Sequence, residues 1–168
     1  MTIAFMGCGS SPTNSIDLHG VVTTDDLSEM PDDRLVNMLG HELPWTRLSA
    51  AKALAERGPQ SASLFIDRLN EEDWRVVRAA QDGLIALLRE ANKDEDTDDG
   101  NEIRSAVIEA IPALKRNLQH EHYYVRMGGL QCLGALGADA APAGDLICDR
   151  TEDEDYLGVV PTDRKSVV

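Results

Sequence analysis

A segment that occurs three times along the chain constrains the fold most. The copies span residues 44–54, 74–84 and 123–133, and their last residues are 30 and then 49 residues apart. Their apolar and small residues align column by column. Recurrence of this kind indicates a repeat protein, in which each unit buries its apolar face against its neighbours. The sequence therefore predicts an all-α fold of stacked helical units.

An apolar pair with a spacing of four residues precedes each copy, and this spacing places both side chains on one face of a helix. Each unit is therefore predicted to be a first helix, a short polar turn and a second helix. The apolar pairs of the first helices are Leu35 and Leu39, Phe65 and Leu69, and Leu114 and Leu118. The predicted core face of the second helices holds Ala50, Leu54, Ala80, Leu84, Leu87 and Leu133.

Pro31 and the two aspartates after it predict the start of the first helix, because acidic side chains favour the positive end of the helix dipole. Gly58 and Gly137 each follow a closing leucine by four residues and are predicted helix C-caps. The predicted organisation is a flexible tether (1–30), a repeat domain (31–150) with an acidic insertion (92–102), and an acidic tail (151–168).

The middle unit carries Leu88 where the other two have the glycine, so its second helix is predicted to continue to about Ala91. Pro112 falls inside the apolar stripe that leads into the third unit and predicts a kink or a break there. A further helix is predicted past the third unit, through Leu146 and Ile147. These elements amount to about three and a half helical hairpins.

The repeat resembles the HEAT-repeat family, in particular its short bacterial type, also described as phycobilisome-lyase-like. Second helices of that family open with Val-Arg-x-x-Ala-x-x-Ala-Leu, and Val125-Arg126 match this opening fully, Arg47 at the arginine and Val76 at the valine. The resemblance covers residues 31–149 and implies a right-handed α-solenoid of antiparallel hairpins. It also implies that Arg47 and Arg126 tie neighbouring turns together, and that the protein binds or scaffolds rather than catalyses.

Charge restricts the partners. The net charge is −14 and the isoelectric point is about 4.5, which opposes binding to nucleic-acid phosphates and anionic lipids. We expect a protein partner with a basic or neutral surface and no nucleic acid. No run approaches the roughly 20 apolar residues that span a bilayer, so we expect no membrane insertion apart from a lipid anchor. Cys132 lies inside a second helix and is predicted to be a small buried apolar residue.

The N-terminal sequence FMGC, ending at Cys8, resembles the end of a bacterial lipoprotein signal, and Gly-Ser-Ser-Pro follows it as a tether would. Two features depart from that pattern: no basic residue precedes the apolar stretch, and the stretch is short. Two interpretations stay open. In the first, Cys8 is lipidated and anchors the protein to the cell envelope, and the true start of the chain lies upstream. In the second, Cys8 is an ordinary residue of a cytoplasmic protein.

Two His-Glu dyads, His41-Glu42 and His120-Glu121, raise the question of a metal site. Deoxyhypusine hydroxylase, an enzyme of the HEAT-repeat family, holds two irons with such dyads on its inner helices. Metal ligation requires imidazole and carboxylate groups to converge on one ion. Here both dyads occupy the same column, in the polar turn between two helices, so we interpret them as solvated turn residues. We expect no catalytic residue, no bound metal and no cofactor.

Asp94, Asp96 and Asp98 alternate as calcium ligands do in an EF-hand loop. Such a loop needs glycine at its sixth position and glutamate at its twelfth. Those positions hold Asp99 and Ser105, so we prefer a solvated acidic insertion to a calcium site. A calcium-responsive adaptor is kept as an alternative function.

The exposed face of the second helices is the main candidate for function, since stacked second helices form the inner wall of such a solenoid. A plain solvated face is the other interpretation. Four aromatic residues near the helix starts (Trp45, Trp74, Tyr123 and Tyr124) are predicted to pack between units. The sequence thus predicts a non-catalytic binding or scaffolding module, with an accessory subunit of a lyase or metal-dependent hydroxylase as an alternative. The candidate binding residues are Lys52, Glu56, Arg78, Asp82, Arg89, Met127 and Gln131.

Overall fold

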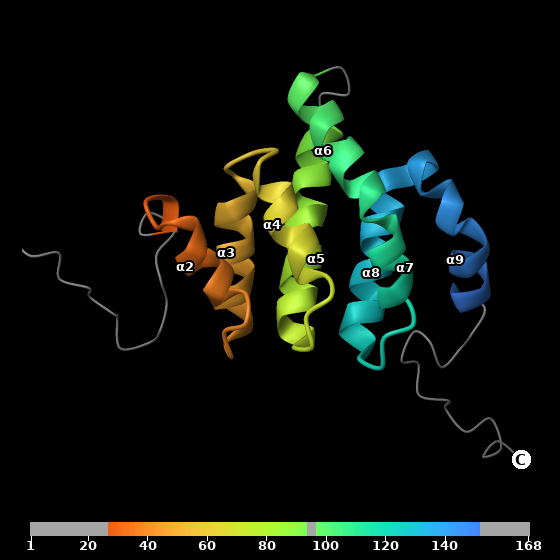
Figure 1. Ribbon diagram of the computed structural model, residues 1–168, viewed down its shortest axis with the longest axis horizontal. Coiled ribbons are helices and arrows are strands. Elements are labelled where there is room, and N and C mark those ends of the chain that lie inside the picture. Colours follow the sequence, from red (N-terminus) through yellow and green to blue (C-terminus); the bar gives the residue numbers. More distant parts are fainter. Residues whose placement is uncertain (1–26, 94–96, 152–168) are drawn as a thin grey trace, which may run out of the picture.

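The computed structural model describes residues 27–93 and 97–151, and all regular structure in these ranges is helical (Figure 1). The chain is therefore all-α, as predicted. A 3-10 helix, η1 (Gly137–Ala143), connects the last two α-helices. The α-helices are α2 (Asp32–Met38), α3 (Pro44–Ala55), α4 (Ser61–Arg68), α5 (Trp74–Ala91), α6 (Asp98–Glu109), α7 (Ile111–Asn117), α8 (Tyr123–Leu136) and α9 (Gly144–Thr151).

The helices α3, α5 and α8 are the predicted second helices, and they lie side by side with α5 in contact with both neighbours (Figure 1). Each first helix packs on its own second helix: α2 on α3, α4 on α5 and α7 on α8. The apolar pattern explains this arrangement, because every residue of the predicted pairs and of the predicted core face is at most 1% exposed. Cys132 is fully buried as predicted.

Two glycines of the second helices permit close packing. A Cβ atom on Gly83 of α5 would overlap the ring of Phe65 on α4. A Cβ atom on Gly128 of α8 would overlap the Gln81 side chain of α5. The absence of a side chain at these positions therefore sets how closely α5 approaches both α4 and α8.

Helix ends agree with most of the predictions. Helix α5 ends at Ala91, and Gly137 is the C-cap of α8 with a φ of 61°. Gly58 has a φ of 89° and lies two residues past the C-cap of α3. The predicted break occurs before Pro112, which lies in the first turn of α7, where its missing N–H is tolerated.

Two predicted boundaries are wrong. The packed core begins at Leu27, which is 1% exposed, although we placed residues up to 30 in the tether. Leu27 and Met30, three residues apart, form too short a pattern to predict burial. The acidic insertion does not extend to residue 102, because α6 begins at Asp98. The Thr97 hydroxyl caps this helix by accepting a hydrogen bond from the Gly100 N–H at 3.1 Å.

Candidate binding surface on α3, α5 and α8

Three large apolar side chains remain exposed on the second helices. Trp45 and Leu48, one turn apart on α3, are 53% and 57% exposed, and Tyr124 of α8 is 54% exposed. Trp45 and Tyr124 occupy the same column of the repeat, in which α5 carries Arg75. The prediction that Trp45 packs between units is therefore wrong. Trp45 and Leu48 are neighbours on one helix, and adjacent apolar side chains that a fold leaves in water are typical of an interaction surface.

Aromatic packing does connect α5 to α8 at their N-terminal ends. The rings of Trp74 and His122 stack with centroids 3.8 Å apart and planes 8° apart, and Tyr124 lies 5.9 Å from Trp74. Tyr123 contacts Tyr124 at 5.4 Å. The prediction of packing between units is thus confirmed for Trp74. Tyr124 belongs to the same stack and still exposes half of its surface.

The two histidines of the dyads close the turns that precede α3 and α8. The Nδ1 atom of His41 accepts a hydrogen bond from the Leu43 N–H at 3.1 Å, and Nδ1 of His120 accepts one from the His122 N–H at 2.9 Å. Each histidine must therefore carry its proton on Nε2. This identical use of the imidazole in two units gives the dyad column a structural role.

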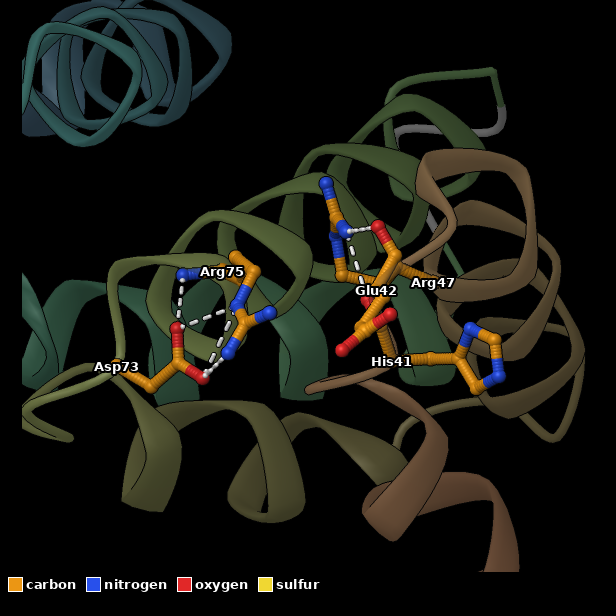
Figure 2. A network of polar contacts seen from close by, with 5 residues as sticks. All are labelled: His41, Glu42, Arg47, Asp73 and Arg75. Atoms are coloured by element: carbon orange, nitrogen blue, oxygen red, sulfur yellow. Dashed lines mark hydrogen bonds and ion pairs between the residues drawn. The ribbon is translucent and has the colours of Figure 1, made fainter.

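Arg47 and Arg126 complete the same turns. Figure 2 shows Arg47 Nη1 donating to the carbonyl oxygens of His41 and Glu42, at 2.7 and 2.9 Å. Arg126 Nη1 donates in the same way to the carbonyl oxygens of His120 and Glu121. These bonds hold each arginine to the turn of its own unit, whereas the resemblance implied a tie between neighbouring turns.

Arg47 also reaches the next unit, since its guanidinium lies 5.8 Å from the centroid of the Trp74 ring. Burial lowers the pKa of Arg47, and the positive charge of Arg75 lowers it further. Arg75 itself holds Asp73, which caps α5 (Figure 2): the Asp73 carboxylate accepts from the Arg75 backbone N–H at 2.9 Å and from Nη2 at 2.8 Å. The hydrogen bonds from the Arg75 side chain hold the pKa of Asp73 below its ordinary value.

Three of the candidate binding residues form one polar tie between α5 and α8. Arg78 Nη2 donates to Asp82 at 2.7 Å and to Gln131 at 3.0 Å, and Nη1 donates to the Tyr124 carbonyl at 3.4 Å. The side chains of Arg78 and Asp82 are only 21% and 26% exposed. Burial raises the pKa of Asp82, and the charge of Arg78 offsets part of that effect. These groups already satisfy one another, so they contribute more to helix packing than to a free surface.

The remaining candidates are spread along the exposed face. Lys52 and Glu56 form an exposed ion pair at 3.7 Å near the end of α3. Arg89 is exposed on α5, and Met127 is half-buried on α8. Trp45 and Leu48 were not predicted as surface residues. Leu48 shares the column of Arg78 and Met127, and that alignment could have identified it.

The metal candidates do not converge. In the described segments, no three His, Cys, Asp or Glu side chains come together as metal ligands would. Asp98 lies in the first turn of α6, whereas Asp94 and Asp96 are outside the described residues. The lipidation candidate Cys8 is also outside them.

Comparison with known proteins gave no match among family models, curated proteins or solved structures. Within residues 27–93 and 97–151, no helix combines the length and apolar character needed to cross a membrane. The case for function therefore depends on the geometry of the exposed face of α3, α5 and α8.

Proposed function

We propose that this protein is a non-catalytic protein-binding module, a right-handed HEAT-like α-solenoid that holds its partner on the exposed face of α3, α5 and α8. One observation carries the proposal: Trp45 and Leu48 on α3 and Tyr124 on α8 are each more than half exposed, on the two helices that flank α5. Burial of a large apolar side chain contributes about 1.5–3 kcal/mol, and tryptophan and tyrosine often dominate binding energy.

Two further features support the repeat assignment. The turns before α3 and α8 are closed by the same pair of side chains, His41 with Arg47 and His120 with Arg126. Each first helix packs on its own second helix, and α5 contacts both α3 and α8. Packing of each unit on its neighbours is expected of a solenoid, and the shared turn of the first and third units supports a common repeat.

The partner we propose is a protein with a basic or neutral surface, because the net charge of −14 repels acidic surfaces and phosphate backbones. The lipid anchor at Cys8 remains part of the proposal. It would place the module and its partner at the cell envelope, and the intact mass of the native protein, measured after separation of membrane and soluble fractions, distinguishes this from a cytoplasmic location.

The test of binding uses tagged protein expressed in its own host, with three forms compared after mild crosslinking. These are the wild type, the double variant Trp45→Ala/Leu48→Ala, and Ile108→Ala. Ile108 on α6 is 39% exposed and serves as a matched apolar control. We expect the wild type and the control to recover the same stoichiometric partner and the folded double variant to lose it. An unchanged partner with the double variant would refute the surface, and no stoichiometric partner with any form would refute the function.

A further inference from the structure

A groove of about 560 Å³ lies where the ends of α3 and α5 meet the start of α6. Its apolar lining comes mainly from Ala55, Ala86, Leu87 and Ile103, on three different helices. The alanines keep the groove open, because larger side chains at these positions would fill it. A cavity of this size accommodates one or two large side chains of a bound chain.

The charged lining of the groove is predominantly acidic. The charged side chains that line the groove are one cation, Lys52, and three carboxylates, Glu56, Glu90 and Asp99. Lys52 pairs with Glu56 at 3.7 Å, and Lys93 outside the groove pairs with Glu90 at 2.7 Å. These pairs are more than 60% exposed, and such pairs exchange partners at little cost. Within the described residues, no ion pair involves Asp99, which is exposed in the first turn of α6.

We propose that this groove binds a basic amphipathic segment of a partner protein. A large apolar side chain of the segment lies against Ala86 and Leu87, and a lysine or arginine next to it pairs with Asp99 and Glu90. This inference rests on the proposed protein-binding function and adds a second contact site, at the opposite end of α3 from Trp45. It also gives α6 a role, because Asp99 and Ile103 lie on this helix and line the groove.

Charge decides between the candidate occupants. A second copy of this chain carries a net charge of −14 and is repelled by the acidic lining. Nucleic acid is repelled for the same reason. An uncharged apolar segment would fit the floor of the groove but bring no partner to Asp99, which has no ion pair among the described residues. A basic segment contacts the floor and also supplies a cation to Asp99.

The test uses a fluorescein-labelled 14-residue peptide of leucine and lysine with helical spacing, titrated with the full chain and followed by fluorescence anisotropy. Ala86→Phe fills the groove, and the double variant Glu90→Gln/Asp99→Asn removes two carboxylates. Asp67→Asn, an exposed acid on α4 away from the groove, is the charge control. Circular dichroism verifies that each variant is folded.

We expect Ala86→Phe to weaken peptide binding about 10-fold or more, since it excludes the apolar side chain. Each lost carboxylate should weaken binding about two- to five-fold, and Asp67→Asn should leave it within about two-fold. Equal losses from Asp67→Asn and from the groove carboxylates, or no loss from Ala86→Phe, would overturn the proposal. Partner capture that depends on Trp45 and Leu48 is measured separately, so the groove can fail while the protein-binding function stands.

Discussion

Replacing Gly83 with alanine tests the close contact between α4 and α5. A new Cβ atom at this position would overlap three ring carbons of Phe65, whose side chain is 0% exposed. Overpacking of a filled core costs about 1–3 kcal/mol, and the better helix propensity of alanine returns about 1 kcal/mol. Because the overlap is with a rigid buried ring, we expect a net loss of about 1–2 kcal/mol in the free energy of unfolding.

The matched control is Gly134→Ala on α8, where nothing beyond the local helix backbone lies within 4 Å of the new Cβ. The same chemical change should stabilise there by about 0.5–1 kcal/mol, through helix propensity alone. Urea unfolding followed by circular dichroism at 222 nm measures both changes. The double variant Phe65→Leu/Gly83→Ala should recover part of the loss, with a coupling energy of about 1 kcal/mol. If Gly83→Ala stabilised the protein as Gly134→Ala does, the packing of α4 on α5 described above would be refuted.

Two further predictions concern the polar contacts. Arg47→Met removes two charge-assisted hydrogen bonds to the turn before α3 and should lower the free energy of unfolding in urea by about 1–2 kcal/mol. The control Arg34→Met, on the exposed side of α2, should change it by less than about 0.5 kcal/mol. Equal effects would show that the turn bonds do not stabilise the fold. The folded-state pKa of Asp73 is lowered, so its stabilisation is present above its ordinary pKa of 3.8 and is lost as pH falls through the folded pKa. The folded-state pKa of Asp82 is raised, so its contribution is present below 3.8 and is lost as pH rises through the folded pKa. Acidification from pH 6 to 3 should therefore lower the stability of the wild type relative to Asp73→Asn. The same acidification should raise the stability of the wild type relative to Asp82→Asn. Parallel pH profiles for the two variants would contradict both assignments.

The buried half of the structure could be predicted from the sequence because burial imposes a period. Two residues of a helix that are buried together must lie on one face, and a spacing of four residues places them there. Leu35 with Leu39, and Ala80 with Leu84, show this spacing. Leu27 has only Met30, three residues further on and partly buried, as an apolar partner in its short segment. One such pair is too short a pattern to predict burial.

The exposed half was harder to predict because it is not periodic. Trp45, Arg75 and Tyr124 align in the repeat but share no chemical property, so the column does not indicate burial or exposure. An aromatic side chain is usually buried when a core is available, and this favoured the wrong prediction for Trp45. Only the structure shows that Trp45 leaves about half of its surface in water, whereas the ring of Trp74 stacks on His122. Exposure of this kind follows from the stacking order of the units, which composition does not encode.

The groove illustrates the same limit and also explains why the middle unit departs from the repeat. The first and third units close their turns with an arginine, but the aligned residue of the middle unit is Val77, which is 1% exposed, and Asp73 caps its second helix instead. The same unit extends α5 to Ala91 and adds α6, and these two additions form one side of the groove. Regular units bury one another and thereby build the stack. The irregular unit supplies surface that the stack does not need, and for this reason we place the more selective contact with the partner there.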